Sequence, residues 1–261
     1  MDKLDLTPFL ARGFSAKADS LIANIPVEGI DKYHTYSQIR LAPETSEYLY
    51  NEYTPATVKY YKGSRPDLER ILENIHIENL NSGKEKIMAI MKWVAMNIKH
   101  ARYAGSETPG NRALSEEELI SSGWGWCNEK ARIFVSMAQI AGFPARMCSL
   151  FHLDKTHGHM TSEVYVDSKW AFTDPTSATV IVSPATGDWA DARALSWDQS
   201  LHDEIDKTYL KNIKAMSELH GTGKEFNGSI WYNDNPYKMF YQIGITNYPV
   251  ITFPCGTTIA G

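Results

Sequence analysis

The sequence predicts an α+β fold in which helices pack on an antiparallel sheet. Three observations support this class. Residues 67–77 and 84–98 have the apolar periodicity of amphipathic helices. A further helical pattern starts at residue 127 and ends at Gly142-Phe143-Pro144. Short apolar segments bounded by turn residues follow, and they predict consecutive strands over residues 146–153, 159–166 and 170–173.

Cys127 is predicted to open the third helix. Apolar side chains recur at helical spacing after it, and the glycine and proline of residues 142–144 favour a helix end there. Cys127 would therefore lie in the first turn, where unpaired backbone N–H groups and the positive end of the helix dipole favour a thiolate. Ahead of it, Ser115 and Glu118 have the spacing of a capping box and predict another short helix.

His159 and Asp174 are predicted to lie on neighbouring strands. The turn at Asp167-Ser168-Lys169 is short enough for a tight hairpin. Such a hairpin places Asp174 opposite the beginning of the strand that carries His159, within reach of the imidazole. His159 would then accept the thiol proton of Cys127, while Asp174 fixes the tautomer of the ring and stabilises its charged form. We therefore predict Cys127 as a nucleophile, His159 as a base and Asp174 as the carboxylate that orients the base.

These three residues stand in motifs that resemble the transglutaminase-like superfamily of papain-like cysteine enzymes. The family pattern is a Cys-x-x-x-Ala helix start, a His-x-x-x-Glu-Val strand, and an Asp-Pro pair after a strand that contains Trp. The matching residues are Cys127 and Ala131; His159, Glu163 and Val164; and Trp170, Asp174 and Pro175. The link over residues 142–146 also looks like that of the family. The resemblance covers about residues 85–180.

The resemblance implies a Cys-His-Asp mechanism and a transglutaminase-like core more firmly than it implies a substrate. The family includes protein-crosslinking acyltransferases, peptidases, amidases, amide-bond-forming enzymes and members that have lost catalysis. We expect Glu163, on the strand of His159, to make a salt bridge or hydrogen bond rather than to act in catalysis. Asn128 and Glu129 depart from the family pattern, and a carboxylate at Glu129 would oppose the thiolate if it faced the site.

Three aromatic residues are candidates for substrate binding or for an oxyanion hole. Trp124 and Trp126 immediately precede the nucleophile, and Tyr103 lies upstream. An indole N–H or a phenol O–H can assist the backbone N–H groups at a helix start in stabilising an oxyanion. Simple packing of the helix entrance is the alternative for each of the three.

We expect no metal and no cofactor. His152, Asp154 and His157 lie close to His159 and Cys148 in the chain, but their spacing matches no compact zinc motif. Cys148 lies in an apolar strand and is expected in the core, whereas Cys255 carries no signal of a site. An odd number of cysteines, three in 261 residues, suits a reducing compartment better than a disulfide framework.

Composition limits the classes of partner. The net charge of −5 is mild, and Lys and Arg are scattered along the chain, which argues against nucleic acid as a partner. No apolar run approaches the length of a membrane span, and Asp2, Lys3 and Asp5 interrupt the N-terminal segment where a signal peptide would be apolar. We expect a cytoplasmic protein that acts on a small-molecule, peptide or glycoconjugate substrate.

The expected organisation is one transglutaminase-like domain over residues 1–261. Its core spans about residues 67–183, and residues 1–66 and 184–261 are elaborations that hold the specificity. We expect residues 48–61 to be extended and residues 197–219 to be helical. The aromatic-rich residues 226–253 either pack as a loop-rich tail or wall a substrate cleft.

The expected function is a cysteine-dependent acyl-transfer reaction in which an amide-type substrate is hydrolysed, or transferred, through a Cys127 thioester. Two other classes stay open. The first is a lyase or isomerase, acting on a carbohydrate-type substrate, in which Cys127 and His159 form a proton-transfer pair. The second is a non-catalytic binding module that retains the scaffold.

Overall fold

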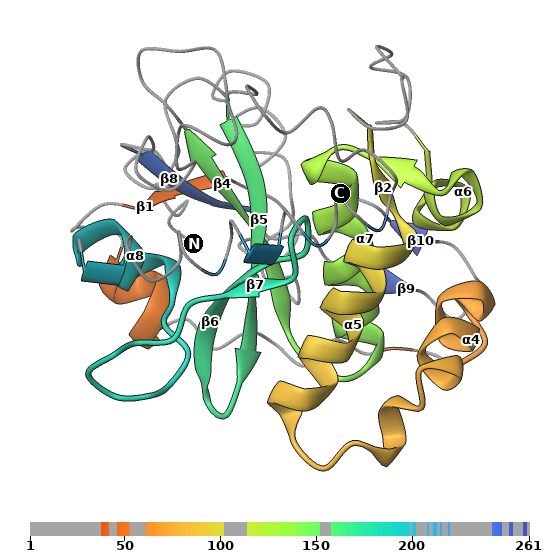
Figure 1. Ribbon diagram of the computed structural model, residues 1–261, viewed down its shortest axis with the longest axis horizontal. Helices are drawn as coiled ribbons and strands as arrows, with labels where there is room; N and C mark the ends of the chain where they lie inside the picture. The colour runs from red at the N-terminus through yellow and green to blue at the C-terminus, as the bar shows by residue number, and fades with distance from the viewer. Residues whose placement is uncertain are drawn as a thin grey trace, which may run out of the picture.

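The computed structural model describes residues 38–41, 46–52, 60, 62–101, 114–151, 158–198, 242–246, 251–252 and 258–259, with a few positions between 200 and 219. Over these residues the fold is α+β, as the sequence predicts. Figure 1 shows the helices α4 (Pro66–Asn74), α5 (Gly83–Asn97), α6 (Glu116–Ser122) and α7 (Cys127–Ile140) gathered to one side of an antiparallel sheet.

The main sheet has the strand order β1-β8-β4-β5-β6-β7, with every neighbouring pair antiparallel. Its strands are β1 (Gln38–Leu41), β8 (Gln242–Thr246), β4 (Ala145–Phe151), β5 (Gly158–Val166), β6 (Lys169–Asp174) and β7 (Thr179–Val180). The three predicted strands are therefore confirmed as β4, β5 and β6, although residues 152–153 lie outside the described residues. β1 and β8 come from the two regions that flank the expected core.

A two-residue turn sets the register between β5 and β6. Asp167 and Ser168 have φ angles of 52° and 63°, the left-handed values that a tight hairpin turn with the right strand twist requires. Ser162 then pairs with Thr173, and Val166 pairs with Lys169. This register fixes which residues of β5 lie next to the end of β6.

Local sequence signals set the helix ends. Ser82 and Glu85 form a capping box at the start of α5, and Ser115 and Glu118 form the predicted one at the start of α6. At the end of α7, Gly142 has a φ of 88°, and the Phe143 N–H donates to the Ala138 carbonyl at 2.9 Å. The segment predicted as one helix over residues 67–77 is α4 followed by a short 3-10 helix, η3 (Ile77–Asn79).

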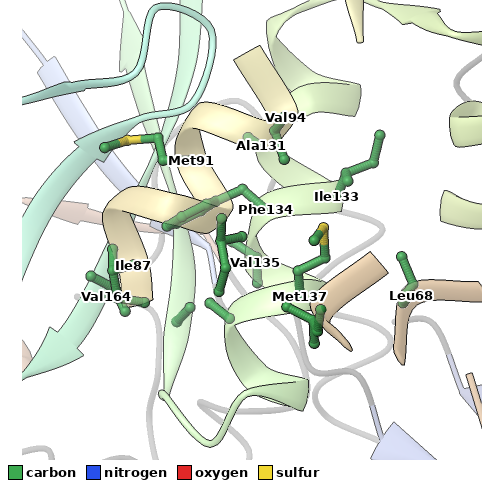
Figure 2. Packing of buried hydrophobic residues seen from close by; sticks show 14 of the residues in the cluster. Leu68, Ile87, Met91, Val94, Ala131, Ile133, Phe134, Val135, Met137 and Val164 are labelled. Carbon is green, nitrogen blue, oxygen red and sulfur yellow. The ribbon is translucent and has the colours of Figure 1, made fainter. Parts of the chain in front are cut away.

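Helix α7 lies in the middle of the hydrophobic core. Figure 2 shows its side chains, among them Phe134, Val135 and Met137, meeting those of α5, Leu68 of α4 and Val164 of β5. Phe134 and Val164 have no exposed surface. Burial of apolar side chains is the main favourable term in folding. Because α7 is packed against several elements, its position is fixed from several sides.

A buried polar network occupies the opposite face of β4 and β5. Arg146 and Glu163 are paired in register and form an ion pair, with 2.8 Å between Arg146 Nε and Glu163 Oε2. Glu163 Oε1 also accepts from the Tyr50 hydroxyl at 2.9 Å and from the Ala192 N–H at 2.8 Å. Glu163 thus takes the structural role that the sequence predicts.

This network holds two flanking segments on the sheet. Tyr50 belongs to the π-helical turn η2 (Tyr48–Glu52), and Ala192 is the first residue of α8 (Ala192–Trp197). The prediction of an extended segment is therefore wrong for residues 48–52; residue 60 has no regular structure, and residues 53–59 and 61 lie outside the described residues. The Leu49 carbonyl accepts from Arg146 at 3.1 Å, a tertiary contact that local sequence does not reveal.

The C-terminal region is only partly described. Every described position between 200 and 219 is helical, as predicted for residues 197–219, but α8 ends at Trp197 and Asp198 is extended, so the predicted helix is interrupted there. Within the aromatic-rich residues 226–253, β8 is a strand of the main sheet and β9 (Ile251–Thr252) pairs with β10 (Thr258–Ile259). The prediction of a loop-rich tail for residues 226–253 is therefore incomplete, because part of this segment forms strands. No helix among the described residues has the length and apolar character to cross a membrane.

Replacing Glu163 with Gln should lower the free energy of unfolding by about 3–5 kcal/mol, because it leaves the buried Arg146 guanidinium without its counter-charge. Chemical denaturation measures the change. The control is Arg70→Gln, which breaks an exposed ion pair with Asp67 and should cost at most about 1 kcal/mol. Equal effects of the two substitutions would contradict the role given to Glu163.

Candidate active site

Cys127 is the first residue of α7, as predicted. The preceding residues form β3 (Trp124–Gly125), which pairs in parallel with β2 (Lys99–His100) directly after α5. At Gly125 a Cβ atom would lie 2.8 Å from the Glu129 Cβ, so only glycine permits this close approach. The pairing of β2 with β3 thus fixes the position of the backbone directly before Cys127.

Glu129 caps the helix that Cys127 opens. Its Oε2 accepts from the Trp126 N–H at 2.9 Å, which satisfies one of the backbone donors ahead of the first turn. The side chain of Glu129 has no exposed surface. The departure from the family pattern at this position therefore has a structural use, since the carboxylate fixes the residue directly before the nucleophile.

His159 and Asp174 lie side by side in the sheet. The register of β5 and β6 places Asp174 beside Thr161, and a strand repeats its face every two residues, so His159 shares that face. His159 Nε2 donates to Asp174 Oδ2 at 2.8 Å, and both side chains are fully buried. The other carboxylate oxygen of Asp174 accepts from the Thr176 N–H at 2.8 Å, which fixes the carboxylate in place.

Cys127 lies next to His159 and Asp174 and completes the predicted triad, a row of three residues. Its thiol interacts with the side chain of His159, whose Nε2 serves Asp174. The Met160 N–H also points at the sulfur, with 3.5 Å between nitrogen and Sγ. The structure therefore brings together all three residues of the predicted triad, in the order Cys127, His159, Asp174.

The electrostatics of the row favour a charged pair. Burial alone would raise the pKa of Cys127, but the hydrogen bond and positive charge of His159, with the Met160 N–H, outweigh burial and lower it. Burial alone would lower the pKa of His159, but Asp174 and Cys127 together raise it to about 10. Both shifts favour a thiolate beside an imidazolium at neutral pH.

Cys148 is the internal contrast. It lies in β4 with no exposed surface, and burial followed by the charge of Glu163 raises its pKa well above that of an ordinary thiol. Cys148 is thus a small buried side chain, as the sequence predicts. Both Cys127 and Cys148 are free thiols, and Cys255 lies outside the described residues.

The candidate oxyanion residues have mixed outcomes. Trp124 and Trp126 are half-buried at the start of α7, and the Trp126 ring contacts His100 edge to face with 5.4 Å between ring centroids. The Trp126 backbone N–H is used by Glu129. Tyr103 lies outside the described residues. His100, which the sequence analysis did not single out, reaches the entrance of α7 through the pairing of β2 with β3.

Lys130 is the second residue that the sequence analysis missed. It follows Cys127 by three residues, so it lies one helical turn further along the same side of α7, and only 1% of it is exposed. A lysine among the apolar positions of a core helix was the signal that could have found it, because lysine is almost never fully buried without a partner.

No group of three or more His, Cys, Asp or Glu side chains with the geometry of a metal site occurs in the described part of the chain. The residues that raised a metal interpretation in the sequence, His152, Asp154 and His157, lie outside it.

One comparison with known proteins matches the part of the chain that carries these three residues. Residues 71–175 match the model of the transglutaminase-like superfamily, and they span α7, β4, β5 and the end of β6. This part of the chain is therefore similar to the core of transglutaminase-like proteins. The predicted resemblance to this superfamily and the predicted α+β fold class are therefore confirmed. A search of curated proteins gave no match.

Three solved structures are similar over part of the chain. A candidate cysteine protease from Cytophaga hutchinsonii has 19% identity and a TM-score of 0.37, over 56% of this chain and 45% of that one. A protein described as a TGase has 16% identity and a TM-score of 0.37, over 57% and 39%. A candidate protease from Parabacteroides distasonis has 14% identity and a TM-score of 0.34, over 42% and 23%. The chain thus covers less than half the length of each.

Mild alkylation at slightly acidic pH should modify Cys127 before Cys148. The pKa of Cys127 is lowered and that of Cys148 is raised, so Cys127 holds the larger thiolate fraction at any such pH. Peptide mapping after brief treatment with iodoacetamide measures the ratio. Labelling of Cys148 with an inert Cys127 would contradict the assigned geometry.

Asp174→Asn should lower the pKa of His159 while the fold persists. Burial already favours the neutral ring, and the carboxylate is the main group that opposes burial, so its loss moves the pKa down from about 10. The side-chain oxygen that accepts from Thr176 is retained in Asn, which protects the turn. NMR titration of the imidazole measures the pKa of His159. An unchanged pKa would show that Asp174 does not stabilise the charged form of the ring.

Proposed function

We propose that the chain is a cysteine-dependent acyl-transfer enzyme that hydrolyses, or transfers, an amide-type substrate through a thioester on Cys127. The observation that carries the proposal is the buried imidazole of His159, which is hydrogen-bonded to Asp174 and interacts with the thiol of Cys127. This arrangement supplies a nucleophile, an acid–base group and its orienting partner in one row.

The first half-reaction follows from the charged pair. The Cys127 thiolate attacks the carbonyl carbon of the amide, and a carbon–sulfur bond forms as the carbonyl oxygen gains negative charge. We propose that backbone N–H groups at the start of α7 stabilise this oxyanion, and Trp124, Trp126 and Tyr103 are our candidates to assist them. The His159 imidazolium gives its proton to the leaving nitrogen as the carbon–nitrogen bond breaks, and an amine leaves.

The second half-reaction restores the enzyme. Neutral His159 takes a proton from water, or from an acceptor amine, as that group attacks the thioester carbonyl. The carbon–sulfur bond breaks, the acid or the new amide leaves, and Cys127 returns as a thiolate beside the imidazolium. Asp174 keeps Nε2 as the donor throughout, so Nδ1 faces the reacting atoms in both halves.

The direction of the pKa shifts favours acyl transfer over proton abstraction from carbon. A lowered thiol pKa makes Cys127 a weaker base, while the nucleophilicity of a thiolate falls much less steeply with its pKa. His159, with a pKa of about 10, is charged at neutral pH and serves as an acid for a leaving amine rather than as a free base. A non-catalytic module would have no use for the cost of burying these charges.

The regions outside the family match are our candidates for specificity. β1 and β8 from the two flanking regions join the same sheet as β4 and β5, so we propose one domain in which residues 1–66 and 184–261 elaborate a core of residues 67–183. Small amides, peptides and glycoconjugates are the substrate classes we propose.

Intact-mass spectrometry tests the thioester directly. Pools of candidate amides are supplied to Asp174→Asn, which keeps the imidazole but slows turnover, and the protein should gain the mass of the acyl group on Cys127. Cys127→Ala in the same background should gain none, and Cys148→Ala should gain the same mass as its parent. In the parent chain, Asp174→Asn should reduce turnover by roughly 10²–10⁴-fold.

Lyase or isomerase chemistry gives the opposite result. It predicts exchange of a substrate C–H with solvent deuterium, dependent on Cys127, without any adduct on that residue. That outcome, obtained with pooled acidic sugars, would overturn the acyl-transfer proposal and leave the site geometry in place.

A further inference from the structure

Lys130 is buried beneath the start of α7, where it contacts the end of another helix. Its Nζ donates to the Ile98 carbonyl at 2.7 Å and lies 3.4 Å from the Ala95 carbonyl. Ile98 is the C-terminal cap of α5, so these oxygens belong to the negative end of that helix. A buried ammonium is therefore compatible with this position, and Lys130 fastens α5 to the first turn of α7.

The three residues of the site, Cys127, His159 and Asp174, form what we call the charged row. In the thiolate–imidazolium form it carries two negative charges and one positive charge, hence a net charge of −1. Both His159 and Asp174 are fully buried, so water screens this charge poorly. Lys130 interacts electrostatically with Asp174 and with Cys127, and its ammonium offsets the net negative charge of these three residues.

We infer that Lys130 is a positioning residue of this site, whose buried ammonium balances the net negative charge of the row and thereby keeps Cys127 as a thiolate. The inference rests on the proposed function only in using the same site. Burial lowers the pKa of Lys130 to about 7, against the opposing charges of Asp174 and Cys127. The attraction is mutual, because a thiolate that stabilises an ammonium is stabilised by it equally.

The other titratable groups nearby have separate partners. Glu129, next to Lys130 on α7, directs its carboxylate to the Trp126 N–H. His100, two residues beyond the Ile98 acceptor, contacts the ring of Trp126. Lys130, in contrast, interacts electrostatically with both Asp174 and Cys127.

A purely structural role for Lys130 makes different predictions from a charge-balancing role. Gln139 provides the comparison, because it is also a buried polar residue of α7 that donates to a backbone carbonyl, that of Ala145, at 2.9 Å. Gln139 is at the far end of the helix from Cys127. Loss of either side chain removes a fastening hydrogen bond, but only the loss of Lys130 removes a charge beside the row.

The experiment measures the pH profile of Cys127 alkylation in Lys130→Met and in Gln139→Met. Lys130→Met should raise the pKa of Cys127 and slow its alkylation at slightly acidic pH roughly tenfold, which corresponds to a shift of one pKa unit. Gln139→Met should leave the profile unchanged while lowering the melting temperature. Lys130→Arg, which keeps the charge, should restore part of the reactivity. A wild-type profile in folded Lys130→Met would overturn the inference.

A reciprocal measurement decides the matter if Lys130→Met does not fold. NMR of the labelled Lys130 ammonium follows its titration in the unmodified chain and in Cys127→Ser, which replaces the thiolate with a neutral group of similar size. The inference predicts a lower pKa of Lys130 in Cys127→Ser, because a counter-charge has been lost. An equal or higher pKa would refute it.

Neither readout needs a substrate. A failure to find acyl-transfer activity would therefore not affect the inference about Lys130. In the same way, a finding that Lys130 has no effect on the pKa of Cys127 would not affect the proposed reaction.

Discussion

The imidazole of His159 and the carboxylate of Asp174 meet at 2.8 Å in a place that water does not reach. Such a pair is stable only when geometry and hydrogen bonds compensate for the loss of hydration. Here the compensation comes from a two-residue turn that sets the register of β5 and β6, and from the Thr176 N–H that holds the second carboxylate oxygen. The position of the base follows from this pair, and the charge on Cys127 follows from the base.

Helix α7 brings the third residue to the pair. Its core face is packed against α5, α4 and β5, and its start is fixed by Gly125, by the Glu129 cap and by Lys130 on the end of α5. Residues in the first turn of so constrained a helix have little freedom to move. On the other face of the sheet, Arg146 and Glu163 hold η2 and α8, so the strands that carry the site are supported from both sides.

The parts of this structure that the sequence predicts are those set by local rules. Helical periodicity and a glycine–proline end place Cys127 at the start of α7, and a tight turn places Asp174 beside the strand of His159. The insertion of β8 between β1 and β4 depends on pairing with residues about 100 and about 200 positions earlier in the chain, which no local pattern records. The helical turn at Tyr48–Glu52 likewise depends on the buried Arg146, and tertiary contact there overrides propensity. Lys130 was missed because its significance lies in charges on other elements.

Thiolate formation as a function of pH tests the account most directly. The thiolate absorbs in the ultraviolet, so a titration of the protein against Cys127→Ser reports the charge on this one sulfur. The account predicts a Cys127-dependent thiolate signal that persists below the ordinary thiol pKa of 9.0 and is lost only when acid protonates the sulfur. A signal that appears only as the pH approaches or exceeds that ordinary value would contradict the charged pair on which the proposed chemistry depends.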